Sequence, residues 1–351
     1  MVRITSIATA NPPHRIDEGQ ADALLDRAAE RLGINPTSLR RVLQNTHITS
    51  RYTTRSAAEL DLPMSLEARN DLYMQQSLEL AERVTLEALD RAAVSPADID
   101  AVITVSCTGH MIPAIDAYLV NRIGLSPNVR RTPISQLGCI AGAVGLARAW
   151  EELQVYPDSN VLLLAVELPS LTFQPYDRRL QQLVASMLFT DGAAAVVVSK
   201  RATTASPSLL GRRMYTIPNT IDDMGYNLAD DGLHIVLSRA VPRLIQRTLP
   251  AQLDAMLHPR GLRRSDLRWF AIHAAGAKIL ELVEAELGLR REQLAASWTV
   301  LQQYGNMSSA AVLFVVAEML KNPPAQPGDL GVIVAFGPGV SGEIVLARWE
   351  Q

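Results

Sequence analysis

A cysteine at the start of an expected helix is the first residue of this chain whose position suggests chemistry. Over residues 133–153 a short apolar segment stops at Gly138 and Cys139, and a run with helical periodicity follows directly. Unpaired N–H groups and the positive end of the helix dipole favour an anion at a helix N-terminus, so the pattern predicts a lowered thiol pKa and a nucleophilic Cys139. For a single cysteine, a small buried core residue is the commoner alternative.

A second stretch of the chain repeats the first. Residues 305–320 align without a gap on residues 138–153, and Asn306 then takes the place of Cys139. The same offset carries the strand expected over 268–273 onto the one over 101–106, which puts His273 at a strand end. If the two halves pack about a pseudo-twofold axis, Cys139, His273 and Asn306 converge. Taken singly, His273 is also explained as a satisfied strand end and Asn306 as a helix cap.

Composition and charge narrow the function classes. The 351 residues are 48% hydrophobic and 20% charged, which is ordinary for a large globular protein. A net charge of −3 and dispersed basic residues argue against a nucleic-acid surface. Two cysteines give no disulfide framework, and no apolar run reaches the roughly 18 residues of a membrane span. We therefore expect a cytoplasmic protein without membrane or nucleic-acid partners.

Strands and helices are expected to alternate along both halves. The longest helical pattern covers residues 65–93 with Ser65 as its N-cap, and a helix is also expected over 17–32. Apolar runs such as 161–166 lack polar alternation, which indicates strands covered on both faces. The polar stretch 201–208 is interpreted as a linker between a first half over 1–200 and a second half over 209–351. Residues 222–232 are expected to form a loop.

The positioned residues resemble a known family. Gly138-Cys139, His273, the run 305–310 and the turn 336–339 (Phe-Gly-Pro-Gly) are similar to the type III polyketide synthases of the chalcone synthase superfamily, and Cys107 favours their bacterial members. The resemblance spans nearly the whole chain. It implies an α/β, thiolase-like duplicated fold with five layers, αβαβα, which agrees with the internal repeat.

The resemblance also implies roles for the three converging residues. Cys139 would take an acyl group from coenzyme A, and His273 would form an ion pair with its thiolate. His273 and the Asn306 amide would then donate hydrogen bonds to the thioester oxygen of malonyl-CoA as it loses carbon dioxide. The resulting carbanion would attack the acyl group on Cys139.

The same resemblance gives an expected substrate site. Phe189 matches an aromatic residue between the coenzyme A tunnel and the cavity, whereas Ile235 falls where a second aromatic gate is usual and would leave the inner cavity wider. Arg41 falls where family members contact a coenzyme A phosphate, and Lys278 lies near the expected tunnel mouth. The other expected cavity residues are Cys107, Thr172, Pro169 and Ser308, and Ile112 occupies a position that commonly reaches into the partner's cavity.

These expectations define one function and two alternatives. We expect a homodimeric acyltransferase that loads an acyl-CoA starter, extends it repeatedly with malonyl-CoA or an alkylmalonyl-CoA, and cyclises the chain to an aromatic or pyrone product. Coenzyme A thioesters are its substrates, and neither a metal nor a redox cofactor is implied. The alternatives are a ketoacyl-acyl carrier protein synthase III that condenses once, and a non-catalytic homologue that only binds acyl groups.

Overall fold

The fold is built on one long sheet whose two halves repeat the same strand arrangement. The computed structural model describes residues 1–201 and 206–350, so residues 202–205 of the expected linker lie outside it. Nine strands form the sheet in the order β11-β12-β13-β8-β1-β7-β6-β4-β5. The halves meet where β1 (Val2–Ala10) pairs with β8 (Pro207–Thr216) over only two residues of each strand.

The strand directions of the two halves show the repeat. In the first half β7 is antiparallel to β1 and β6, and β4 is parallel to β6. In the second half β13 is likewise antiparallel to β8 and β12, and β11 is parallel to β12. The edge strand β5, parallel to β4, extends the first half by one further strand. By strand order, β4 and β11 are equivalent, as the sequence repeat predicts. The remaining strands are β4 (Ala101–Val105), β5 (Arg130–Ile134), β6 (Val161–Glu167), β7 (Gly192–Ser199), β11 (Leu267–Ile272), β12 (Leu330–Gly337) and β13 (Ser341–Trp349).

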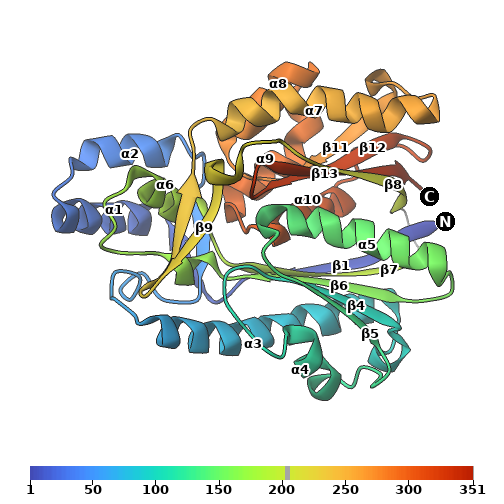
Figure 1. The fold of residues 1–351 in the computed structure, drawn as a ribbon, viewed down its shortest axis with the longest axis horizontal. Helices are drawn as coiled ribbons and strands as arrows, with labels where there is room; N and C mark the ends of the chain where they lie inside the picture. Colours follow the sequence, from blue (N-terminus) through green and yellow to red (C-terminus); the bar gives the residue numbers. More distant parts are fainter. Residues whose placement is uncertain (202–205, 351) are drawn as a thin grey trace.

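Helices complete the five expected layers. In Figure 1, α5 (Ala141–Val155) and α10 (Ser309–Lys321) lie between the two halves of the sheet. The outer faces are covered by α3 (Leu66–Ala92) with α4 (Ile115–Arg122), and by α7 (Val241–Leu257) with α8 (Ala277–Leu287). A helix between two sheets must be apolar nearly all round, and α5 and α10 are buried over most of their length.

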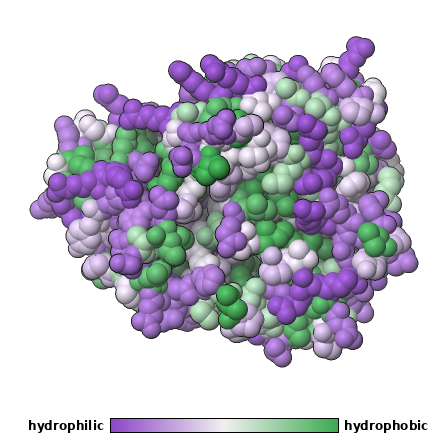
Figure 2. All heavy atoms as spheres, in the orientation of Figure 1, coloured by the Kyte–Doolittle hydropathy of each residue, from purple (hydrophilic) through white to green (hydrophobic). Residues whose placement is uncertain are grey.

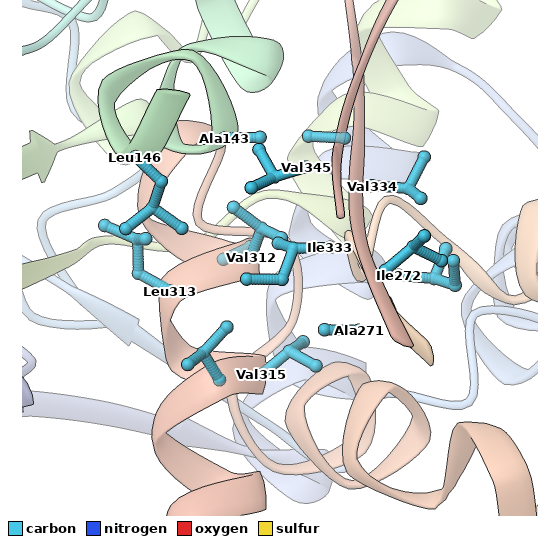
Figure 3. Packing of buried hydrophobic residues seen from close by; sticks show 14 of the residues in the cluster. Ala143, Leu146, Ala271, Ile272, Val312, Leu313, Val315, Ile333, Val334 and Val345 are labelled. Carbon is cyan, nitrogen blue, oxygen red and sulfur yellow. The ribbon is translucent and has the colours of Figure 1, made fainter. Parts of the chain in front are cut away.

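The two central helices touch through glycine. A Cβ at Gly142 would lie 2.1 Å from the backbone oxygen of Ser309 and 2.9 Å from Val312 Cγ1, so only glycine permits this approach. Around the contact, Figure 3 shows Ala143 and Leu146 of α5 near Val312 and Leu313 of α10, with strand residues beside them. The repeat therefore sets α5 and α10 in direct contact, and the residues that precede each helix are brought together.

A smaller group of elements lies at one end of the layers. It contains α1 (Glu18–Leu32), α2 (Pro36–Gln44), α6 (Leu180–Leu188), a two-stranded sheet of β2 and β3 (His14–Asp17, Ser50–Thr53) and the β9–β10 hairpin (Met224–Ala229, Gly232–Leu237). The expected loop over 222–232 is wrong, because β9 pairs with β10 along all six of its residues. The helix α9 (Ala295–Tyr304) completes the described helices.

Local signals at helix starts are confirmed. The Ser65 side chain accepts a hydrogen bond from Ala68 N, and Asp17 forms a capping box with Gln20 at the start of α1. Among the described residues, the structure contains no helix that is both long and apolar enough to span a membrane.

Candidate active site

Cys139 lies at the N-terminal end of the first central helix, as the sequence predicts. It is in a 3-10 turn, Gly138–Ile140, that runs directly into α5. The turn Phe336–Gly339 packs against it, since a Cβ on Gly138 would lie 2.7 Å from Pro338 and one on Gly337 would lie 2.9 Å from Ile140 N. The glycine-rich turn at the end of β12 therefore packs against the Cys139 turn and fixes its position.

The second repeat meets the cysteine from the opposite side. Cys139 Sγ lies 3.4 Å from Ser308 Oγ, and Ser308 immediately precedes α10. Ser308 has a φ of +51°, in the left-handed region that non-glycine residues seldom adopt. The strained backbone turns its hydroxyl toward the sulfur.

Asn306 connects this segment to the segment that carries His273. Its Nδ2 donates to Ala275 O over 3.1 Å, and its Oδ1 accepts from Ser308 N over 2.9 Å. Ser308, not Asn306, occupies the N-cap position of α10, so a helix cap is not a sufficient explanation of Asn306. An amide nitrogen carries two N–H groups, and one of them remains for a substrate oxygen.

His273 follows β11 directly and is fully buried. The backbone N–H of His273 donates to Val334 O on the neighbouring strand. Ala275, whose carbonyl oxygen accepts from Asn306, lies two residues after His273 in the chain. Within the part of the chain that is described, neither ring nitrogen has a hydrogen-bond partner. Both ring nitrogens of His273 therefore remain available to form a hydrogen bond with a substrate.

The protonation states differ from the sequence expectation. Burial raises the pKa of Cys139 to about 12, and hydrogen bonds from Ser308 and from the backbone oppose this only in part. Burial also lowers the pKa of His273 to about 3. The predicted lowered thiol pKa is therefore wrong for the protein without substrate, because removal of the thiolate from water outweighs the helix terminus. Burial therefore favours the neutral form of each group, the thiol of Cys139 and the imidazole of His273.

A buried carboxyl group beside these residues has no counterpart among the expected site residues. Glu167, at the end of β6, accepts from Ser309 Oγ over 2.5 Å and from Thr108 Oγ1 over 2.9 Å. Cys107 Sγ lies 3.5 Å from Glu167 and 3.6 Å from Ser308 Oγ. Burial raises the pKa of Glu167. The sequence could have indicated Glu167, because it directly follows an apolar strand pattern and the carboxyl ends of parallel strands commonly carry functional side chains.

A cavity of about 1180 Å³ adjoins the site. Cys107, Thr172 and Gly138 line it, and the Thr172 hydroxyl donates to Pro169 O over 2.8 Å. Figure 2 shows hydrophobic side chains in a hollow near the middle of one face, among hydrophilic ones. The wall also includes Tyr226 of β9, a partly buried aromatic residue absent from the sequence prediction because its segment was interpreted as a loop.

The two residues expected to act as gates lie next to the cysteine. Phe189, at the C-terminal end of α6, forms a buried cluster with Cys139, Ala185 and Ile235. Ile235 pairs across the hairpin with Tyr226, while the large cavity is lined from β10 by Gly232, Leu233 and Val236. Ile235 therefore packs in the cluster around Cys139, and its cross-strand neighbour Tyr226 lines the large cavity. The expected widening of the inner cavity at Ile235 stays a prediction.

Three expected residues lie at the surface. Arg41 is exposed on α2, and Lys278 is exposed on the first turn of α8, where Nζ lies 3.5 Å from Glu281. The Ile112 side chain is 82% exposed and precedes the cis peptide bond at Pro113. The structure thus brings together Cys139, His273, Asn306, Ser308, Cys107, Thr172, Pro169, Phe189 and Ile235, and leaves these three outside.

Comparison with known proteins follows the same two halves. The family description "Chalcone and stilbene synthases, N-terminal domain" matches residues 3–201, and the C-terminal domain of that family matches residues 212–349. The chain is 35% identical over 357 residues to the 1,3,6,8-tetrahydroxynaphthalene synthase of Streptomyces peucetius subsp. caesius, with 99% of this chain and 93% of the relative covered. It is 28% identical over 312 residues to the phloroglucinol synthase of Pseudomonas fluorescens, with 88% of each covered.

The fold comparison agrees with the sequence comparison. The crystal structure of 1,3,6,8-tetrahydroxynaphthalene synthase from Streptomyces coelicolor A3(2), described as a bacterial type III polyketide synthase, superposes with a TM-score of 0.94 at 31% identity and 99% coverage of both chains. The mirrored layers around a buried cysteine are thus a thiolase-like fold, the fold of an acyl-transfer enzyme.

The chain belongs to the chalcone and stilbene synthase family. It is a type III polyketide synthase, an acyltransferase that forms carbon–carbon bonds by iterative condensation, and the resemblance inferred from its motifs is confirmed. Matches to this family over both halves also decide against the single-condensation alternative.

Proposed function

We propose that this enzyme loads an acyl-CoA on Cys139, extends it with malonyl-CoA or an alkylmalonyl-CoA, and cyclises the product to an aromatic or pyrone polyketide. The observation that carries the proposal is the convergence of Cys139, Asn306 and the unpaired His273 beside a cavity of about 1180 Å³. Relatives named as tetrahydroxynaphthalene and phloroglucinol synthases support an aromatic product.

Loading begins from the neutral pair. Neutral His273 accepts the thiol proton as Cys139 Sγ attacks the thioester carbonyl, so the nucleophile forms as it reacts and no lone buried thiolate has to persist. The carbon–sulfur bond of the acyl-CoA breaks, and the leaving coenzyme A sulfur takes the proton back from His273. The enzyme then holds the acyl group on Cys139 and has released free coenzyme A.

Extension uses the same residues as hydrogen-bond donors. As the malonyl carboxylate leaves as carbon dioxide, negative charge moves onto the thioester oxygen, where N–H groups of His273 and Asn306 stabilise it. The carbanion attacks the acyl carbonyl, and Cys139 leaves as the new carbon–carbon bond forms. Because Ala275 O and Ser308 N hold the Asn306 amide, its free N–H is oriented before substrate binds.

The cavity residues set what fits. Phe189 and Ile235 pack in one buried cluster with Cys139, so they are placed to restrict entry of the acyl-CoA. Thr172, Cys107 and Ser308, with Pro169 behind Thr172, line or approach the space for the growing chain. Arg41 and Lys278 would contact phosphates of coenzyme A from the surface. Their exposed side chains can change rotamer toward a bound phosphate without disturbing the packed interior.

We also propose a homodimer, with each chain composed of halves over residues 1–200 and 209–351. The edge strand β5 supports the dimer, because it pairs only with β4 and its residues are largely exposed. Ile112 adds an exposed apolar side chain. An Ile112→Glu variant should sediment as a monomer, whereas Ile221→Glu, which changes an equally exposed residue, should remain dimeric. A cytoplasmic location fits the two free cysteines, Cys107 and Cys139.

Product analysis tests the reaction. Purified protein is incubated with malonyl-CoA alone and then with malonyl-CoA plus a panel of acyl-CoA starters, and products are identified by mass spectrometry. Products that contain several malonyl-derived units support the proposal. Release of a single-condensation product only, or no turnover with any starter, would contradict it.

A further inference from the structure

A small pocket separate from the large cavity lies between α1, α6 and the two-stranded sheet of β2 and β3. Its volume is about 110 Å³, and most of its wall is apolar. Ala21, Leu24 and Ala28 contribute from α1, and Leu183 and Met187 contribute from α6. Neither Cys107 nor any other lining residue of the 1180 Å³ cavity belongs to this wall.

A buried guanidinium group forms part of the wall. Arg51, on β3, donates from Nε to Met187 O over 2.7 Å, near the C-terminal end of α6. Among the described residues, Nη1 and Nη2 are both buried without a hydrogen-bond partner. Burial lowers the pKa of Arg51 to about 10, which still leaves the group charged at neutral pH. A buried cation with unused donors is costly unless an anion accompanies it.

Neighbouring arginines do not share this situation. Arg69, also buried, donates to Leu171 O, Phe173 O and Gln174. Arg31 lines the same pocket, but it donates to Pro175 O and to Asp61. Asp61 also accepts from Arg27, so the one carboxylate among the lining residues of this pocket already has two cationic partners. Arg51 is thus the pocket cation without a counter-anion.

We propose that this pocket binds a short-chain aliphatic monocarboxylate, whose carboxylate pairs with Nη1 and Nη2 of Arg51 and whose alkyl tail packs between α1 and α6. Two parallel N–H donors match two carboxylate oxygens, which is the favoured geometry of guanidinium recognition. At about 30 Å³ per water, the volume equals about four waters, so acids of roughly four to six non-hydrogen atoms fit. Butyrate is an acid of this size.

The pocket shares a residue with the active site. Phe189 is on its wall and also packs against Cys139. A bound acid would therefore contact the aromatic side chain that borders the nucleophile. Binding is measured directly, so failure of this proposal and failure of the polyketide reaction are distinguishable.

Calorimetry with matched ligands and variants tests the pocket. Butyrate and its neutral isostere butyramide are titrated into the full-length enzyme at neutral pH. We expect one butyrate per chain with a dissociation constant on the order of 1 mM, and butyramide at least about tenfold weaker. Equal affinity for acid and amide, or no butyrate binding up to about 50 mM, would overturn the proposal.

Two variants and a control locate the site. Arg51→Met should weaken butyrate binding by about tenfold or more. Because loss of the bond to Met187 O could unfold α6, Ala28→Phe fills the apolar end without touching Arg51 and should weaken binding equally. Arg122→Met, on the distant α4, should bind as the parent does. Unchanged binding in Ala28→Phe would show that Arg51 serves only the C-terminal end of α6.

Discussion

Gly142→Ala tests whether the contact between the two repeated helices positions the active site. The added methyl would lie 2.1 Å from Ser309 O, and that oxygen belongs to the backbone of the first turn of α10. Helix backbone cannot rotate away as a side chain can. The helices must separate by about 1 Å before the contact becomes tolerable, because interiors are packed without slack.

The expected magnitudes follow from that displacement. Alanine gains about 1 kcal/mol over glycine within a helix, whereas overpacking costs about 1–3 kcal/mol and more when backbone must move. We expect a net loss of about 1–2 kcal/mol in the free energy of unfolding. Since Ser308 carries Oγ 3.4 Å from Cys139, a shift of about 1 Å should slow acylation by about 100-fold.

Gly145→Ala is the matched control on the same helix. There the added methyl would meet the tip of the Leu163 side chain at 2.3 Å, and a side chain can change rotamer. Urea unfolding followed by circular dichroism and acylation followed by intact mass spectrometry are measured for both variants. If Gly142→Ala and Gly145→Ala show the same midpoint and the same acylation rate, the helix contact does not set the geometry of the site.

Three further predictions concern single residues of the site. In a Cys107→Ser background, the rate of alkylation of Cys139 by iodoacetamide should rise through pH 9 without a plateau, because a pKa raised to about 12 leaves little thiolate at neutral pH; a plateau below pH 7 would show a resting thiolate. Asn306→Asp keeps an acceptor for the α10 segment but sets a carboxylate against the developing enolate, so malonyl-CoA decarboxylation should fall by about 100-fold; near-normal decarboxylation by the folded variant would reduce Asn306 to a structural residue. Ile235→Phe adds a ring beside Cys139 and should exclude long starters or shorten products while short starters still acylate; an unchanged product spectrum would refute a gating role.

The sequence predicts the parts of this fold that depend on local pattern. The repeat of 138–153 in 305–320 is visible because both helices lie in the middle layer and are buried over most of their length, so the two segments need the same apolar pattern. The offset between the repeats then places His273 and Asn306 with Cys139. The hydrogen bonds through Ala275 and Ser308 agree with that prediction.

Features that arise from distant contacts could not be predicted. The pKa of Cys139 depends on how completely α6, α10 and the β9–β10 hairpin cover it, and no local pattern encodes that burial. Tyr226 was missed because its strand is short, carries Gly225 and Asn227, and pairs only with β10. The unpaired nitrogens of Arg51 become visible only when β3 is placed against α6.

The central claim is that the polyketide is built on Cys139. Enzyme is mixed with an acyl-CoA starter without extender, quenched in acid, and examined by intact mass and by peptide mapping. We expect one acyl group per chain, located on the peptide that contains Cys139, and neither adduct nor polyketide from Cys139→Ala. An acyl group that persists in Cys139→Ala, or one that maps to Cys107 in the parent enzyme, would contradict the account.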